Sequence, residues 1–411
     1  MNILMLTPDY PPVYGRIGTH VNFLVQKLLE RNKVTVLVRR ITINKNGGYI
    51  KTTVNKKLTV IDIPNSDFIL SGHEKYSIDN YYNIEMNTAD ILGRSIRELL
   101  EILPEEKYDI IHMHDAYTCM AGKLLSIYMK IPLITTLHSM HADKTSIKYY
   151  LREYAVNNSN YVIAVSRFIK NKALQKFHCR SDKIAVVYNS INMEHVFLQK
   201  EIDSDKREIS FCGRFEEIKG VITLIYAFKR ILETVSKANV KLNLIGDGSL
   251  REKVFDLIKE LDLEDNVNVY SNIAHQEVLK IFCRSCCVVI PSIEEPFATV
   301  GLEAMSVKTA VICTNVGGMS EMVLHEKTGY VYSPKDTKAL EQYMMKLIKD
   351  SAKARKFGVE GYNRVRQLFT WEHNALKIEE IYRNVIKNIA PPEEISGDFD
   401  GNGETYESHR S

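Results

Sequence analysis

Short β-rich runs alternate with longer stretches of helical spacing along almost the whole chain, and this alternation limits the fold more than any other sequence feature. In the first half, apolar runs at Ile3–Leu6 and Val34–Val38 lie on either side of an amphipathic stretch, Thr19–Glu30. Such a pattern is typical of parallel sheets whose faces are covered by crossover helices. A chain of 411 residues is long enough for about two to three domains. We therefore expect an α/β protein with more than one domain.

The alternation of strands and helices is interrupted once, by the stretch 191–206, and this interruption predicts a domain boundary. Further strands are expected near residues 109–113, 133–136, 162–165, 184–187, 208–212, 241–245, 266–270, 287–290, 310–313 and 330–332. We predict two facing, doubly wound Rossmann-like domains, 1–190 and 207–370, with a cleft between them and a linker at 191–206. Residues 371–390 are expected to form a helix that packs back on the first domain.

Two segments depart from this alternation. The insertion Thr42–Asn80 is rich in Lys, Asn and Thr, which predicts edge strands and loops. Residues 391–411 carry six acidic residues and one Arg, which predicts a disordered acidic tail. Within the tail, Asp398–Gly403 imitates the start of an EF-hand loop, but the twelfth position is His409 where such a loop has Glu. We therefore expect no calcium site there.

Charge and cysteine content exclude several classes of protein. The 54 Lys and Arg nearly balance the 51 Asp and Glu, which gives no sign of dedicated nucleic-acid binding. Seven scattered cysteines are too few for a disulfide scaffold and fit a reducing compartment. The first residues form a strand-like run and not a signal peptide, and no apolar window is long enough to span a bilayer. We therefore expect a cytoplasmic protein.

One part of the first domain is strongly basic. Residues 144–183 hold nine Lys or Arg against two acidic residues, with Tyr150 and Phe168 among the aromatic residues between them. Helices of this composition can lie on an anionic surface such as the inner face of a membrane, which would give peripheral contact. Ordinary solvated helix faces are the alternative.

The loop that follows the strand at 287–290 carries the strongest chemical signal. A helix is expected to begin near Thr299, and its first amides can bind an anion such as a diphosphate. Glu295 lies before this helix and Glu303 about one turn inside it, so one carboxylate can accept hydrogen bonds from a sugar and the other from a ribose. The alternative is a helix cap at Glu295 and a solvated residue at Glu303.

A second anion site is indicated by the loop after the strand at 208–212. Gly213 lets the backbone bend close to a ligand, and Arg214 and Lys219 supply two cations near the start of the next helix. The order of residues is not that of a Walker A loop. Two ordinary exposed cations are the alternative.

Five motifs now stand in a fixed order along the chain. They are T-P-D-Y-P-P-V-Y-G-R-I-G-T-H, V-V-Y-N-S-I-N, G-R-F-E-E-I-K-G, L-I-G-D-G and P-S-I-E-E-P-F-A-T-V-G-L-E-A-M. In order and spacing they resemble those of the nucleotide-sugar-dependent retaining glycosyltransferases of family 4, which have the GT-B fold. The resemblance covers residues 1–388, and its most specific part is the E-x7-E element with the upstream Arg and Lys. It implies that the first domain binds an acceptor and the second a nucleotide sugar.

The resemblance also implies roles for residues of the second domain. Glu295 would contact hydroxyls of the donor sugar, and Glu303 would hold the ribose. Arg214 and Lys219 would bind the donor diphosphate. The loop around the sugar and the distal phosphate would be formed by the amides of Phe297, Ala298 and Thr299.

In the first domain, the resemblance implies that His138 faces the transferred sugar. The loop from Gly15 to Gly18 would close over the phosphates and border the acceptor. Two positions depart from the family pattern. Arg16 stands where a second Gly is usual, and it either reaches the diphosphate or selects an acidic acceptor. Ala298 replaces a common Gly, which requires an ordinary negative φ there.

The function implied is transfer of a sugar from a nucleotide diphosphate, UDP by family frequency, to a hydroxyl of a glycan, a lipid-linked or a small-molecule acceptor, with retention of configuration. We expect no cofactor and no metal, because no D-x-D motif stands in the catalytic segments. One alternative is a non-catalytic partner subunit that binds the nucleotide sugar. The other is a double-Rossmann NAD(P)-dependent enzyme, whose signal is weak because Arg251 stands where the third Gly of the dinucleotide motif belongs.

Clustered histidines and cysteines raise the question of a bound metal. His112, His114, His138 and His141 lie near two strand ends, but no carboxylate or cysteine completes a recognisable ligand spacing. We assign these histidines to the lining of the cleft or to core contacts. The run Cys283–Cys287 lacks a second ligand pair, and we assign it to apolar packing.

Overall fold

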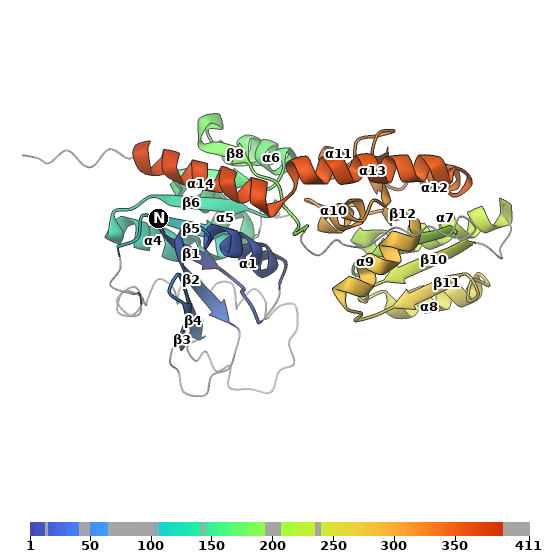
Figure 1. The fold of residues 1–411 in the computed structure, drawn as a ribbon, viewed down its shortest axis with the longest axis horizontal. Coiled ribbons are helices and arrows are strands. Elements are labelled where there is room, and N and C mark those ends of the chain that lie inside the picture. The colour runs from blue at the N-terminus through green and yellow to red at the C-terminus, as the bar shows by residue number, and fades with distance from the viewer. Residues whose placement is uncertain are drawn as a thin grey trace, which may run out of the picture.

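The computed structural model describes residues 1–12, 15–40, 50–64, 103, 107–140, 144, 146–193, 207–234 and 240–388. These residues form two lobes that lie side by side along the long axis of the molecule (Figure 1). The predicted acidic tail, most of the predicted linker and much of the Thr42–Asn80 insertion lie outside the described residues.

The first lobe is built on an eight-stranded sheet with the strand order β3-β4-β2-β1-β5-β6-β7-β8. The strands are β1 (Asn2–Thr7), β2 (Lys33–Arg40), β3 (Ile50–Asn55), β4 (Leu58–Pro64), β5 (Ile110–His114), β6 (Leu133–Leu137), β7 (Tyr161–Ala164) and β8 (Ile184–Val186). Among the strands of the described residues, only the β3–β4 pair is antiparallel, and it lies at the edge, within the predicted insertion. The helices of this lobe are α1 (Arg16–Leu28), α4 (Cys119–Met129), α5 (Ile147–Asn158) and α6 (Arg167–Phe177).

The second lobe is built on a six-stranded parallel sheet with the order β11-β10-β9-β12-β13-β14. The strands are β9 (Arg207–Cys212), β10 (Val240–Ile245), β11 (Val267–Tyr270), β12 (Ser285–Ile290), β13 (Ala310–Thr314) and β14 (Gly329–Tyr332). The helices are α7 (Val221–Thr234), α8 (Arg251–Glu260), α9 (His275–Arg284), α10 (Thr299–Ser306), α11 (Met319–Met322), α12 (Thr337–Lys349) and α13 (Ser351–Leu368).

Apolar periodicity places the core. Every residue of β5, β6 and β13 is buried, as expected for strands covered on both faces. The apolar stripe of α1 contributes Val21, Leu24 and Leu28 to the core of the first lobe. Several helices begin at a side-chain cap, such as Ser166 before α6, whose hydroxyl accepts the amide of Ile169.

The last helix returns to the first lobe. Helix α14 (Trp371–Asn388) packs against α1, while α13 stays on the second lobe (Figure 1). Trp371 and Tyr382 are buried in the first lobe's core. Where the chain crosses between the lobes, the amide of Ile191 donates to the carbonyl of Phe369, so the two crossings lie side by side.

The order of strands explains where a site can form. In each sheet the first strand lies between two strands whose connections run to opposite sides, namely β1 between β2 and β5, and β9 between β10 and β12. Ligands of open α/β sheets bind at such switch points, beyond the carboxyl ends of the strands. The fold class predicted from the sequence, two Rossmann-like α/β sheets of mainly parallel strands, is confirmed.

Candidate active site

One contact joins a helix that follows a strand of the first lobe to a helix that follows a strand of the second. Helix α6 follows β7 in the first lobe, and α11 follows β13 in the second. The carboxylate of Glu321 on α11 accepts the backbone amides of Arg167 and Phe168 at the start of α6, at 2.8 and 2.9 Å. The loops after the strands of both lobes are thereby brought to the same region of the molecule.

The loops after β9 and β12 lie against each other at the second lobe's switch point. The amide of Ile293 donates to the carbonyl of Ile218 at 2.8 Å. Gly220 has φ +71°, and a Cβ there would meet the carbonyl oxygen of Pro291 at 2.2 Å. Only glycine permits both this backbone conformation and this approach. The two predicted anion loops therefore form one surface.

Lys219 and Glu295 form an ion pair across these two loops. Glu295 is only 5% exposed, and the Lys219 side chain is largely covered as well. A buried charge needs a partner, so each of these side chains stabilises the other in place. The structure thus brings together two residues that lie 76 positions apart in the sequence.

Helix α10 begins directly beside this pair, and its cap position carries no side-chain oxygen. The cap residue is Ala298, with the ordinary negative φ of −88° expected for it. Ala is a poor cap because it offers no acceptor to the first amides of the helix. The amides of Thr299 and Val300 belong to the first turn, whose amides have no intrahelical acceptor.

A third loop, which follows β13, packs closely against the backbone of Glu295 and Pro296. Gly317 has φ +58°, and a Cβ there would meet the carbonyl oxygen of Glu295 at 1.6 Å. The amide of Gly318 donates to the carbonyl of Pro296 at 2.9 Å. No role for this loop is predicted from the sequence, although a Gly-Gly pair shortly after a strand indicates such an approach.

Other predicted residues of the second lobe have partners of their own. Arg214 is 67% exposed and pairs with Glu216, its near neighbour in sequence. Glu303 contacts His275, whose Nε2 lies 3.3 Å from the Glu303 carboxylate. The hydrogen bond to Glu303 raises the pKa of His275. Gly213 is fixed by a 2.9 Å hydrogen bond from its amide to the carbonyl of Ile245.

Phe297 turns its side chain away from this surface. Its ring is buried against Tyr188 and Phe369, with centroids 5.8 Å away in each case. Only the backbone of Phe297 can therefore serve a ligand, as the resemblance implies. The ring of Phe297 thus contacts both chain segments that cross between the lobes, because Tyr188 belongs to the first of these segments and Phe369 to the second.

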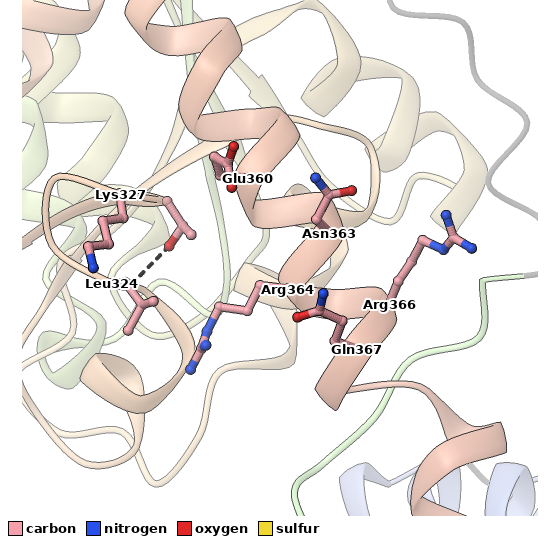
Figure 2. Close-up of a pocket in the computed structure, with 8 residues that line it drawn as sticks. Leu324, Lys327, Glu360, Asn363, Arg364, Arg366 and Gln367 are labelled. Atoms are coloured by element: carbon pink, nitrogen blue, oxygen red, sulfur yellow. Dashed lines mark hydrogen bonds between the residues drawn. The ribbon is translucent and has the colours of Figure 1, made fainter.

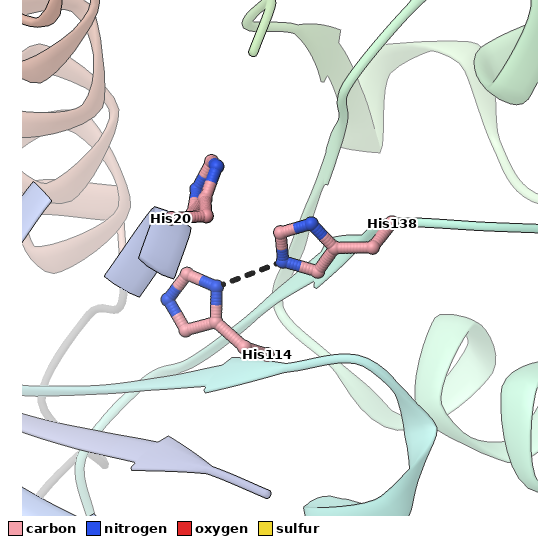
Figure 3. A group of neighbouring side chains, drawn as sticks. All are labelled: His20, His114 and His138. Carbon is pink, nitrogen blue, oxygen red and sulfur yellow. Dashed lines mark hydrogen bonds between the residues drawn. The ribbon is translucent and has the colours of Figure 1, made fainter. Parts of the chain in front are cut away.

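The first lobe contributes a cluster of three imidazoles (Figure 3). His114 ends β5, His138 follows β6, and His20 lies on α1; their nearest ring nitrogens all lie within 4.8 Å of one another. His114 Nδ1 and His138 Nε2 are 3.1 Å apart. Burial lowers the pKa of His20 and His114 well below the ordinary 6.5, so both rings are neutral at neutral pH. The sequence predicts no role for His20, although His20 ends the first of the five motifs.

The four histidines that raised the question of a metal do not form one group. His112 is a core contact, with Nδ1 2.6 Å from the Tyr382 hydroxyl and Nε2 2.7 Å from Thr136. Burial lowers its pKa to about 3. His141 lies outside the described residues. His114, His138 and His20 are close enough to hold an ion, but the facing nitrogens of His114 and His138 already bond to each other.

The glycine loop of the first lobe surrounds a carboxylate. A Cβ on Gly15 would meet Asp9 Oδ2 at 1.6 Å, and one on Gly18 would meet the Asp9 carbonyl at 2.9 Å. Burial raises the pKa of Asp9, while hydrogen bonds from the amides of Gly18 and Gly15 oppose that rise. Asp9 therefore lies at the start of α1. No role for Asp9 is predicted from the sequence. The side chain of Arg16 lies outside the described residues.

A pocket of the second lobe is lined by none of the predicted site residues. It is formed between the turn Leu324–Thr328 and α13, and Lys327, Glu360 and Arg364 line it (Figure 2). Arg364 donates to the backbone carbonyls of Glu321 and Met322, at 2.6 and 3.0 Å. It thus holds the short helix whose carboxylate reaches the first lobe.

Comparison with known proteins decides the family. The model "Glycosyltransferase Family 4" matches residues 17–195, and the model "Glycosyl transferases group 1" matches residues 193–364. The chain belongs to glycosyltransferase family 4. It is therefore an enzyme of glycosyl transfer, and the dinucleotide-dependent enzyme left open by the sequence is set aside.

Relatives and solved structures agree with this assignment. The chain is 27% identical to alpha-maltose-1-phosphate synthase of Mycolicibacterium smegmatis, over 94% of this glycosyltransferase and 100% of the relative. Its fold is similar to that of sucrose-phosphate synthase from Thermosynechococcus elongatus, with TM-score 0.75, 21% identity and coverage of 94% and 99%. It is also similar to Anabaena Alr3699/HepE in complex with UDP, with TM-score 0.71, 18% identity and coverage of 93% and 100%. The structural likenesses show the GT-B fold.

Proposed function

We propose that this glycosyltransferase moves a hexose from a UDP-linked donor to a hydroxyl of a glycan, a lipid-linked or a small-molecule acceptor. Configuration is retained, no metal ion or other cofactor takes part, and the reaction takes place in the cytoplasm. The observation that carries the proposal is the buried Lys219–Glu295 pair beside the start of α10, at the switch point of the second sheet.

The charges at this point suit the departure of a diphosphate. Breaking a bond between a sugar and a phosphate builds negative charge on the leaving group and positive charge on the sugar. The ammonium group of Lys219, the guanidinium of Arg214 and the first amides of α10 are positive groups on adjoining loops. Groups fixed in advance where charge develops supply about 3 kcal/mol each to the lowering of the barrier. These side chains can do so without a metal.

Glu295 is suited to hold a hydroxyl of the donor sugar. Its carboxylate has two oxygens, and the one that bonds Lys219 is Oε2. An ion-paired carboxylate is a weaker nucleophile than one activated for attack, which supports retention by attack from the leaving-group side without a covalent intermediate on the protein. Glu303 lies further along α10 and is suited to the ribose hydroxyls.

The nucleotide of the donor is the least constrained part of the proposal. UDP is supported by its frequency in the family and by the similar fold that was solved with UDP. A basic surface for a lipid-linked acceptor is supported by α5 and α6, where Tyr150 is 55% exposed and Lys172 lies over the ring of Phe168. Among the described residues, no helix combines the length and apolar character needed to cross a membrane.

The test uses the donor alone, because many transferases slowly hydrolyse their donor when no acceptor is present. UDP-, GDP- and ADP-glucose are each added to the full-length protein with and without EDTA. We expect UDP-glucose to raise the melting temperature most and to release UDP at the same rate with EDTA. NMR recorded before mutarotation should show the released glucose in the anomeric form of the donor. Release that stops with EDTA, or a sugar of inverted configuration, contradicts the proposal.

A further inference from the structure

Two imidazoles and a thioether form a row across three neighbouring strands of the first lobe. His114 Nδ1 lies 3.1 Å from His138 Nε2, and His114 Nε2 lies 3.0 Å from Met5 Sδ (Figure 3 shows the two rings). Met5 lies on β1, His114 at the end of β5, and His138 directly after β6, and these strands are adjacent in the sheet. All three side chains are buried.

The sulfur atom determines where the proton of His114 lies. A thioether has no hydrogen and can only accept a hydrogen bond. The nitrogen that faces Met5 must therefore carry a proton, since otherwise two lone pairs would face each other. Burial lowers the pKa of His114, so the ring is neutral and has a single N–H group. That group is Nε2–H, and Nδ1 of His114 is an acceptor.

We propose that Met5, acting through His114, holds a proton on Nε2 of His138. His114 Nδ1 can only accept, so the 3.1 Å contact is a hydrogen bond in which His138 Nε2 donates. Met5 and His114 are thus positioning residues for His138. The importance of this arrangement for transfer rests on the proposed function, in which His138 faces the donor sugar.

The fixed hydrogen bond determines how the His138 ring is held. Nε2 of His138 is directed at His114, so the ring cannot turn over without losing this hydrogen bond. His20 limits rotation of the ring, because its own ring stands edge-on to His138 with centroids 4.6 Å apart and an angle of 83°. The first lobe therefore presents His138 in a single orientation.

The tautomers can be observed directly. The chain has twelve histidines, which can be labelled selectively with nitrogen-15 and assigned one by one with single variants. Long-range proton–nitrogen correlation spectra distinguish a protonated from a bare ring nitrogen. In the unmodified protein we expect Nε2–H at both His114 and His138. A bare Nε2 on His138 would overturn the inference, whether or not the protein transfers sugars.

Substitution of Met5 tests the cause. In Met5→Leu, which nearly conserves the volume, His114 loses the acceptor for Nε2–H. We expect both rings to shift together toward the Nδ1–H forms. Met113→Leu is the matched control, because Met113 is equally buried on β5 but lies between His112 and His114, on the opposite face. If Met5→Leu and Met113→Leu give the same spectra as the unmodified protein, Met5 does not set the tautomer.

Measurements of kcat distinguish a positioning role of His114 from a packing role. In His114→Asn, the amide oxygen can take the place of Nδ1 and accept from His138, whereas in His114→Leu nothing can. We expect His114→Asn to stay within about threefold of the unmodified kcat and His114→Leu to lose about tenfold, as for one hydrogen bond. Equal losses in both variants would show that His114 only fills space. If no donor is turned over at all, the proposed function fails and the spectra alone decide the tautomer.

Discussion

The two lobes carry opposite kinds of chemistry. The second lobe presents an ion pair, an exposed guanidinium and the uncapped start of a helix. The first lobe presents buried imidazoles whose pKa values are lowered by burial, as His114 and His20 show. We call the ion-pair surface of the second lobe the charged face, and the imidazole cluster of the first lobe the neutral face, after the neutral rings of His114 and His20.

This difference fits the two halves of a glycosyl donor. A diphosphate that leaves with growing negative charge is stabilised by fixed positive groups. A sugar has neutral hydroxyls, for which a neutral nitrogen is a sufficient partner. A buried imidazole can lose its proton and become neutral, so it needs no counter-charge. A buried ionised carboxylate such as Glu295 needs a cation, which here is Lys219. The lobe that binds charge must therefore carry charge, and the other lobe need not.

The largest expected effect comes from removing the cation of the buried pair. Lys219→Met removes the ammonium group that pairs with the buried carboxylate of Glu295, and it removes a positive group from the donor diphosphate. We expect kcat/KM to fall by about 10²- to 10³-fold or more, and the free energy of unfolding to fall by about 3 kcal/mol. Steady-state kinetics and denaturant unfolding measure the two effects.

A second substitution separates these effects. In the double variant Lys219→Met with Glu295→Gln, the buried carboxylate charge is removed as well. The free energy of unfolding should therefore partly recover while activity stays low. Lys253→Met is the control, because Lys253 pairs with Glu217 at 3.4 Å and both side chains are well exposed. Activity that returns together with stability in the double variant would show that the pair serves the fold alone.

Arg214 tests whether an exposed cation contributes to the charged face. Arg214→Ala removes a side chain that is 67% exposed and paired only on the surface, so we expect no measurable change in stability. If the guanidinium moves onto the diphosphate, kcat/KM should fall by about 10- to 100-fold. The matched control is Arg251→Ala, since Arg251 makes a similar surface pair with Asp247. Equal kinetics for the two variants would remove Arg214 from the site.

The charged face could be predicted from the sequence because its parts are local. The loops after β9 and β12 each carry their residues within about ten positions, and the apolar period of each strand marks where the loop begins. Lys219 and Glu295 can pair because β9 and β12 are adjacent in the sheet. No motif in the sequence indicates this adjacency. Arg214 is instead closest to Glu216, a charge two positions away that the motif itself contains.

The neutral face could not be predicted in the same way. Met5, His20, His114 and His138 come from four elements, and only the order β1-β5-β6 in the sheet brings three of them into a row. A single histidine at a strand end is usually a core contact, and His112 is one. The contact of Glu321 with α6 joins the two lobes and likewise has no local signature.

That contact gives the next prediction, on how firmly the two faces are held together. Glu321→Ala removes a carboxylate that accepts two amides at the start of α6, so we expect a loss of about 1 kcal/mol in the free energy of unfolding, as for a helix cap. Hydrogen exchange at the amides of Arg167 and Phe168 should accelerate. The control is Glu341→Ala, which breaks a surface pair with Arg230 within one lobe. Unchanged exchange at α6 in Glu321→Ala would show that the lobes are fixed by other contacts.

The smallest expected effect concerns the pH dependence of the charged face. The hydrogen bond to Glu303 raises the pKa of His275 above the ordinary 6.5, so the folded state favours the protonated ring. Its contribution to stability is fully present below pH 6.5 and is lost as the pH rises through the higher folded pKa. His275 is 65% exposed, so solvent screening keeps the effect small.

The measurement compares the melting temperatures of the unmodified protein and His275→Gln between about pH 5 and pH 9. We expect the unmodified protein to be the more stable at the acidic end and the two to converge at the basic end. His373→Gln is the control with the opposite sign, because burial lowers the pKa of His373 and its neutral form is favoured on folding. There the unmodified protein should lose stability, relative to the variant, as the pH falls. The same slope in both variants would mean that a general pH effect, and not the Glu303 carboxylate, sets the behaviour of His275.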